Sequence, residues 1–116
     1  MKKIYYLKTC DTCKRILNSI NLDGFILQDI KSDPITVKQI EEMYILSGSY
    51  ESLFSRRSKK YKVMGLKNQS LTDADIKQLI LEEYTFLKRP VIIFKDTIFI
   101  GNSKKNVEAL LYNFGK

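Results

Sequence analysis

The sequence predicts an α/β domain, and three observations support this prediction. Short runs of β-branched and aromatic residues alternate with longer stretches in which apolar residues recur at helical spacing. Their order is strand–helix–strand, then a helical stretch, then helix–strand–strand–helix. The hydrophobic fraction of 44% is enough for one core, so the 116 residues are predicted to form a single domain, 1–116.

The chain is predicted to begin with a strand–helix–strand unit. Residues 2–7, "KKIYYL", are rich in β-branched and aromatic side chains and indicate a strand. Residues 11–22, "DTCKRILNSINL", carry apolar residues at helical spacing, and Gly24 favours the end of that helix. Residues 25–30, "FILQDI", indicate the second strand.

A helical insertion is predicted at about residues 34–67, between two halves of one core. Its first helix has Thr36 and Gln39 at the spacing of a capping box, and Gly48 follows its end. The segments "YESLFS" and "SKKYKVMG" are predicted to form further short helices.

The second half of the core is predicted to contain two helices and a β-hairpin. The stretch 70–84, "SLTDADIKQLILEEY", is helical in pattern, and Thr72 is a suitable N-cap. Residues 89–94 and 97–101 are two strands on either side of a short turn, and 103–114 form the closing helix.

The only two cysteines, Cys10 and Cys13, lie where the first strand meets the first helix. A thiol reacts as its thiolate, and a helix N-terminus lowers the pKa of a thiol. We therefore predict that Cys10 attacks and that Cys13 resolves the resulting adduct, as is typical of a C-x-x-C pair in a βαβ pattern. The alternative is a pair of small core residues.

Metal binding is not expected at this pair. The chain has no histidine, which excludes His-based zinc sites and Cys–His nucleophile pairs. Two cysteines in one chain do not complete the four ligands of a structural zinc site, so the alternative is a four-cysteine site shared by two chains.

Much of the net charge of +7 falls in residues 56–67, "RRSKKYKVMGLK", a stretch without acidic residues. Such a patch attracts anions, including phosphate, arsenate, glutathione carboxylates, an acidic protein or nucleic acid. The alternative is a solvated basic surface with no partner.

No apolar run approaches the length of a membrane span, and the start "MKKIYYL" lacks the pattern of a signal peptide. A cytoplasmic protein without a membrane partner is therefore expected.

The stretch "FLKRPVII" places Pro90 directly before a predicted strand, where proline is tolerated. A cis bond after Arg89 would leave backbone groups free to face a ligand, although trans is the usual isomer. The residues alone leave the isomer open.

These motifs together resemble the thioredoxin/glutaredoxin fold and, more narrowly, the arsenate reductase (ArsC) family, which includes the Spx regulators and YffB-like proteins. The resemblance rests on "TCDTCKR", "LFSRRSKKYKVMGL" and "FLKRPVII" in this order, and it covers nearly the whole chain. It implies a four-stranded mixed sheet with flanking helices, and a cis bond between Arg89 and Pro90.

The resemblance also implies roles for individual residues. Cys10 matches the nucleophile, Arg89 matches one oxyanion-binding arginine, and Arg57 is the best match for the central arginine, with Arg56 adjoining it. These groups are expected to converge on one anion-binding pocket, because arginines suit an oxyanion.

The chain departs from the arsenate reductases of this class at their third arginine. The corresponding segment is "IFIGNSKK", where Gly101 and Asn102 stand near the expected position. This departure and the presence of Cys13 look more like the Spx and YffB-like members.

Two functions follow from the resemblance. The first is a thiol-dependent oxidoreductase with no bound cofactor that acts on arsenate or a glutathione mixed disulfide. Glutathione, a glutaredoxin or a thioredoxin would be its reductant. The second is an Spx-type redox-sensing transcriptional regulator that binds the RNA polymerase α subunit. Direct DNA binding is not expected, because no nucleic-acid motif is visible.

Overall fold

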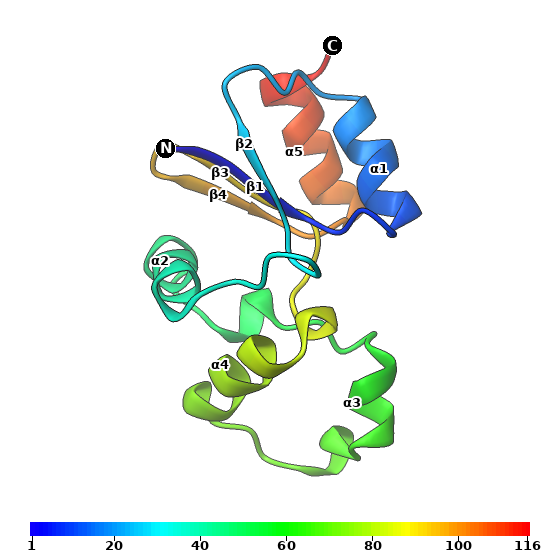
Figure 1. The fold of residues 1–116 in the computed structure, drawn as a ribbon, viewed down its shortest axis with the longest axis vertical. Coiled ribbons are helices and arrows are strands. Elements are labelled where there is room, and N and C mark those ends of the chain that lie inside the picture. Colours follow the sequence, from blue (N-terminus) through cyan, green and yellow to red (C-terminus); the bar gives the residue numbers. More distant parts are fainter. The chain divides into compact units, whose positions relative to one another are not determined.

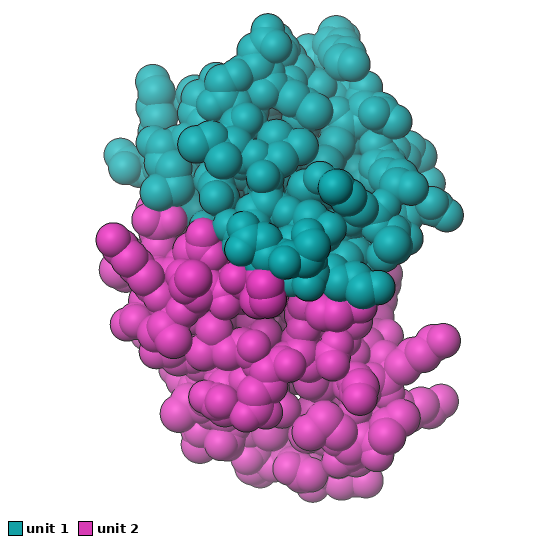
Figure 2. Space-filling model, viewed as in Figure 1, with its two compact units in different colours: residues 1–33, 89–116 teal, residues 34–88 magenta.

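The computed structural model describes residues 1–116, which divide into two compact units (Figure 2). Unit 1 comprises Met1–Asp33 and Arg89–Lys116, and unit 2 comprises Pro34–Lys88. Unit 2 thus extends well beyond the helical insertion predicted at about 34–67. Whether the chain behaves as one domain stays a prediction.

The last residues of unit 2 pack against residues 53–55, in the middle of the same unit. The rings of Phe54 and Phe86 stack with their centroids 5.3 Å apart. The Ser55 N–H donates to the Phe86 carbonyl at 2.7 Å, and the Lys88 N–H donates to the Leu53 carbonyl at 2.8 Å. These contacts join positions more than thirty residues apart, so local sequence patterns could not set the boundary.

Unit 1 contains a four-stranded mixed sheet and two helices (Figure 1). The strands lie in the order β2-β1-β3-β4; β1 pairs in parallel with β2, while β1–β3 and β3–β4 are antiparallel. This confirms the predicted α/β fold and its mixed sheet. The elements are β1 (Lys2–Tyr6), α1 (Asp11–Asn18), β2 (Ile26–Asp29), β3 (Val91–Phe94), β4 (Thr97–Ile100) and α5 (Lys104–Phe114).

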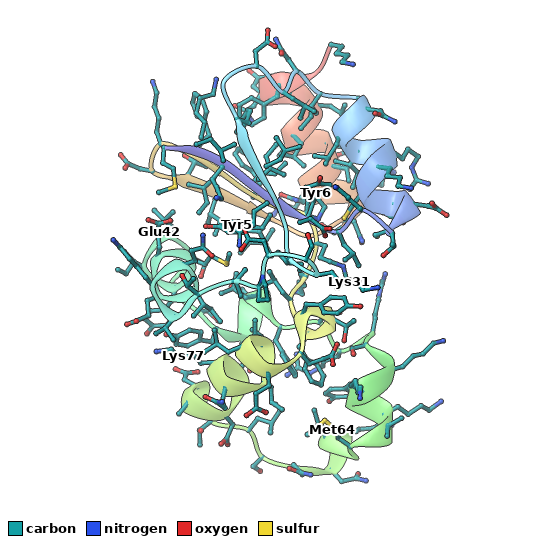
Figure 3. All side chains as sticks on the ribbon, viewed as in Figure 1. Tyr5, Tyr6, Lys31, Glu42, Met64 and Lys77 are labelled. Atoms are coloured by element: carbon teal, nitrogen blue, oxygen red, sulfur yellow. The ribbon has the colours of Figure 1, made fainter.

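The core of unit 1 lies between the sheet and the helices α1 and α5, which run side by side along one of its faces (Figure 1). Successive residues of a strand point to opposite faces. Tyr6 accordingly packs against this core, while the neighbouring Tyr5 projects from the other face of β1 (Figure 3). The buried members of the core are Ile4, Ile16, Leu17, Ile20, Ile92 and Leu110.

Helix α1 ends at Asn18, earlier than the predicted end at residue 22. Ser19 closes the last turn, because its backbone N–H and its hydroxyl both donate to the Ile16 carbonyl, at 3.0 and 2.6 Å. Ile20 then forms a β-bridge with Gly115. The apolar pattern continues past Ser19 because Ile20 is buried in the same core, although it is no longer helical.

The regular elements of unit 2 are helices and 3₁₀ turns, as predicted for its first part, and Phe54 and Leu87 form an isolated β-bridge. The capping box of Thr36 and Gln39 forms at the start of α2, and Thr72 and Asp75 form a second one at the start of α4. Gly48 ends α2 in the left-handed conformation, with φ 74°. The elements are α2 (Val37–Ser47), α3 (Lys59–Val63), α4 (Asp73–Glu82) and the 3₁₀ turns η1 (Glu51–Leu53), η2 (Leu66–Asn68) and η3 (Tyr84–Phe86).

All the helices are short. The longest, α2 and α5, have 11 residues each, whereas a helix needs about 20 apolar residues to cross a bilayer. None of the helices combines the length and the apolar character that a membrane span requires.

Candidate active site

Cys10 is the N-cap residue of α1, with extended backbone angles of φ −95° and ψ 110°. Its N–H donates to the Leu7 carbonyl at 3.1 Å, and its carbonyl accepts the Lys14 N–H at 3.1 Å. Its side chain is partly exposed. The thiol is therefore held at the positive end of the helix dipole while remaining accessible to a reactant.

The surroundings of Cys10 favour its thiolate. Burial acts to raise the pKa of Cys10, but hydrogen bonds from the backbone N–H and the thiol of Cys13 act in the opposite direction. The Arg89 guanidinium adds its charge and a hydrogen bond to the sulfur. The net effect is a pKa of Cys10 below its ordinary value, which increases the nucleophilic form near neutral pH.

Cys13 has the opposite character. It lies one turn into α1 and is 0% exposed, and burial raises the pKa of Cys13 to about 12, with a further rise from the negative charge of Cys10. Both cysteines are free thiols. The pair therefore consists of one accessible thiolate-forming sulfur and one buried, protonated sulfur that donates a hydrogen bond to it.

Arg89 and Pro90 stand at the start of β3, and the peptide bond between them is cis, the isomer that the resemblance implies. Arg89 is half-buried and Pro90 is buried. Because β3 pairs with β1, which leads into Cys10, the pairing carries Arg89 to the same end of the sheet as the thiol. Cys10, Cys13 and Arg89 thus form one contiguous group in unit 1.

The segment after β4 contains Gly101 and Asn102, which stand near the position where the resemblance places a third arginine. The Gly101 N–H donates to the Pro90 carbonyl at 2.8 Å, and Gly101 has a φ of 83°, which favours glycine. The Asn102 side-chain amide donates to the Arg89 carbonyl at 3.4 Å. This segment therefore supplies neutral hydrogen-bond donors to the Arg89–Pro90 backbone rather than another cation.

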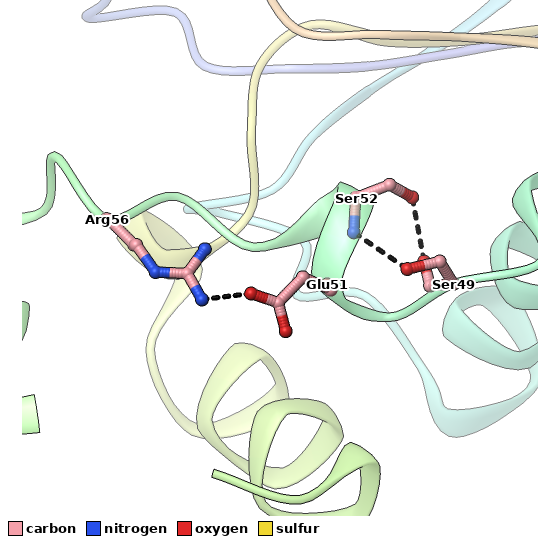
Figure 4. Close-up of polar contacts among 4 residues, drawn as sticks. All are labelled: Ser49, Glu51, Ser52 and Arg56. Atoms are coloured by element: carbon pink, nitrogen blue, oxygen red, sulfur yellow. Dashed lines mark hydrogen bonds and ion pairs between the residues drawn. The ribbon is translucent and has the colours of Figure 1, made fainter. Parts of the chain in front are cut away.

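The two arginines of the central segment belong to unit 2 and differ in their contacts. Arg56 forms an ion pair and hydrogen bond with Glu51 (Figure 4), and this hydrogen bond raises the pKa of Arg56 above its ordinary value. Arg57 is exposed and forms no ion pair. Arg57 is thus the arginine whose charge is not already neutralised, while its convergence with Cys10 and Arg89 stays a prediction. The structure contains no cluster of three or more histidine, cysteine or carboxylate groups suited to a metal ion.

The Cys13 thiol can be tested as a hydrogen-bond donor to Cys10. We expect Cys13→Ala to raise the pH midpoint of Cys10 alkylation by about 1 unit, because one of the bonds that stabilise the thiolate is lost. Cys13→Ser is the matched control, since its hydroxyl can still donate. Alkylation with iodoacetamide followed by mass spectrometry measures the midpoint. Equal midpoints for the two variants would contradict the role of the thiol.

This sheet order, with a C-x-x-C pair at the start of the first helix and a proline before the third strand, defines a thioredoxin-like protein. The sequence pattern of the ArsC family matches residues 5–110, so the chain belongs to the ArsC family.

Several known proteins resemble the chain over almost its full length. The global transcriptional regulator Spx 1 of Bacillus cereus is 24% identical over 114 residues, covering 96% of this chain and 87% of the relative. The solved structure of a YFFB protein has a TM-score of 0.78 at 21% identity and covers 96% of this chain and 99% of its own. An arsenate reductase from Vibrio cholerae has a TM-score of 0.76 at 15% identity and covers 96% of this chain and 95% of its own. These structural likenesses support the thioredoxin-like fold.

Proposed function

We propose that this protein is a thiol-dependent oxidoreductase in which Cys10 is the nucleophile and Cys13 the resolving thiol. The observation that carries the proposal is the contrast between the two sulfurs. Cys10 is accessible at a helix N-terminus with a lowered pKa, whereas Cys13 is fully buried with a pKa raised to about 12. Two thiols poised in opposite protonation states suit sequential attack and resolution.

In the first step, the Cys10 thiolate attacks a sulfur of a glutathione mixed disulfide. A Cys10–glutathione disulfide forms, and the other sulfur leaves as a thiolate. The negative charge of Cys10 then no longer raises the pKa of Cys13, so the Cys13 thiol loses its proton more readily.

In the second step, the Cys13 thiolate attacks the Cys10 sulfur. A Cys10–Cys13 disulfide forms and glutathione leaves as a thiolate, which completes a two-electron reduction of the substrate. A glutaredoxin, a thioredoxin or glutathione returns two electrons to the pair.

The same residues provide a route for arsenate. Cys10 would form a sulfur–arsenic bond with loss of hydroxide, and attack of a second thiol on the Cys10 sulfur would leave the bonding pair on arsenic as As(III). Arg89, with Arg57 as the second arginine, would bind the anion. Gly101 and Asn102, near the expected position of a third arginine, add no positive charge, which favours the mixed disulfide as the better substrate.

A coupled NADPH-oxidation assay tests the proposal. Arsenate and a glutathione mixed disulfide are offered in turn, with electrons from glutathione plus glutaredoxin or from a thioredoxin system. We expect Cys10-dependent turnover of the mixed disulfide that exceeds that of arsenate, with Cys10→Ser as the blank. Equal rates for wild type and Cys10→Ser in every arm would rule out the enzyme.

A second candidate function is an Spx-type regulator that binds the RNA polymerase α subunit. Two observations favour it: relatives named as global transcriptional regulators match 96% of the chain, and a cluster of exposed basic residues surrounds α3. Helix α3 buries none of its residues, and its Val63 is 81% exposed. The basic members of this cluster are Arg57, Lys59, Lys60, Lys62 and Lys67.

A pull-down with purified RNA polymerase α subunit distinguishes the two candidates. We would compare reduced and oxidised protein, a Lys60→Glu/Lys62→Glu variant, and a Lys104→Glu/Lys105→Glu control with the same charge change on α5. Binding that is lost only in the first variant would favour the regulator. Absence of binding in both redox states would count against the regulator and favour the reductase.

A further inference from the structure

We propose that Asn106 of α5, together with Asn102, is a positioning residue that holds the Arg89–Pro90 segment beside Cys10. This inference deepens the proposed function, because it concerns the group that activates the same thiol. Nothing in the sequence pattern or in the family resemblance points to Asn106, which stands in the first turn of an ordinary amphipathic helix.

The contacts form a continuous path from α5 to Pro90. The Asn106 side-chain amide donates to the Gly101 carbonyl at 2.7 Å, a short bond at a part-buried position. The Gly101 N–H in turn donates to the Pro90 carbonyl at 2.8 Å. Both backbone polar groups of Gly101 are therefore hydrogen-bonded, its carbonyl to Asn106 of α5 and its N–H to Pro90.

A second branch reaches the arginine directly. Asn102 follows Gly101, and its side-chain amide donates to the Arg89 carbonyl at 3.4 Å. The two asparagines are thus linked to the Arg89–Pro90 backbone, Asn102 directly through a long hydrogen bond and Asn106 through Gly101.

Asn106 itself is fixed by the cap of α5. Its backbone N–H donates to the Ser103 hydroxyl at 3.2 Å, so the first turn of the helix sets where the amide points. The end of β4 is thereby tied to a helix that packs in the core of unit 1 through Leu110. A rigid support of this kind limits the freedom of a long side chain such as Arg89 to leave its partner.

The consequence reaches the thiol through the Arg89 guanidinium, which hydrogen-bonds the Cys10 sulfur. Loss of the Asn106 amide would let the Gly101 and Pro90 backbone move and would weaken that contact. The other charged groups near Cys10 in sequence are Lys8, Asp11 and Lys14, and all three are exposed.

The pH midpoint of Cys10 alkylation tests the inference in the full-length protein. We expect Asn106→Ala to raise this midpoint by about 0.5 units, since the Arg89 contact is weakened rather than removed. Asn113→Ala is the matched control, because Asn113 lies on the same helix and donates the same kind of bond, to the Ala109 carbonyl at 2.8 Å, away from this path. Asn106→Gln keeps an amide donor, so its midpoint should lie between those of wild type and Asn106→Ala.

A double-mutant comparison separates positioning from a general loosening of the fold. In the Arg89→Gln background, Asn106→Ala should produce no further shift, because the group through which it acts is gone. The exposed Asn102→Ala should show a smaller shift with the same dependence on Arg89, and it keeps the test open if Asn106→Ala folds poorly.

An unchanged midpoint in Asn106→Ala, or an equal shift with and without Arg89, would overturn the inference. Alkylation needs no substrate, so this result stands apart from the proposed function. Absent turnover combined with the predicted shifts would reject the reductase and retain the positioning role.

Discussion

Cys10→Ser is expected to reduce turnover of a glutathione mixed disulfide to the level of the blank, whereas Cys13→Ser is expected to stop the reaction one step later. A serine hydroxyl at position 10 stays protonated in the range where the Cys10 thiol, with its lowered pKa, becomes a thiolate. In Cys13→Ser the attacking thiolate is intact, but no buried thiol is present to displace glutathione from Cys10.

Mass spectrometry of the intact protein after mixing with oxidised glutathione measures this difference. Cys13→Ser should accumulate a Cys10–glutathione adduct, wild type should accumulate an internal disulfide, and Cys10→Ser should show neither. Addition of dithiothreitol should reverse both products. Full turnover in Cys13→Ser without an accumulated adduct would show that glutathione from solution resolves the adduct and that Cys13 does not.

The elements of the fold that could be predicted are those whose signals are local. The capping pair Thr36–Gln39 forms as its spacing indicates, and Thr72 caps α4 as predicted, because these side chains satisfy the free N–H groups of a helix start. The end of α1 was predicted too late because Ile20 keeps the helical apolar spacing, although it is buried as part of a β-bridge with Gly115.

The boundary of the helical insertion is a different case. Residues 70–84 have the pattern of a helix in either unit, so the pattern alone could not assign them. The contacts of Phe86 and Lys88 with Phe54 and Leu53 decide the assignment, and these link distant parts of the chain.

In the candidate site too, features with local sequence signals could be predicted, whereas those that depend on distant parts of the chain could not. The position of Cys10 at a helix start could be predicted because strand and helix patterns meet there. The partnership of Arg89 with Cys10 could come only from the resemblance, because it depends on the antiparallel pairing of β1 and β3. The sequence patterns do not single out Asn106. Its only distinguishing feature in the sequence is a short amide side chain three residues after the capping Ser103, and this spacing is also common in helices without a functional role.

Cys13 should also make the folded state sensitive to alkaline pH. The pKa of Cys13 is about 12 in the folded protein, against roughly 8.5 for an exposed thiol. Because the folded value is the higher one, the contribution of Cys13 to stability is complete below about pH 8.5 and is lost as the pH rises toward 12. Cys10 acts with the opposite sign, since its pKa is lowered.

Comparison of Cys10→Ser with Cys10→Ser/Cys13→Ala isolates this effect, because the tyrosines and lysines that titrate in the same range are common to both proteins. We expect the free energy of unfolding of Cys10→Ser to fall by roughly 2 kcal/mol more than that of the double variant between pH 7.5 and 10.5. Urea unfolding at the two pH values measures it. Desolvation is the largest cause of the raised pKa of Cys13 and persists without the Cys10 charge, so the difference should survive in this background. An equal fall in the free energy of unfolding of both proteins would mean that the buried thiol ionises at little cost. The assignment of Cys13 as the protonated partner of the pair would then have no basis.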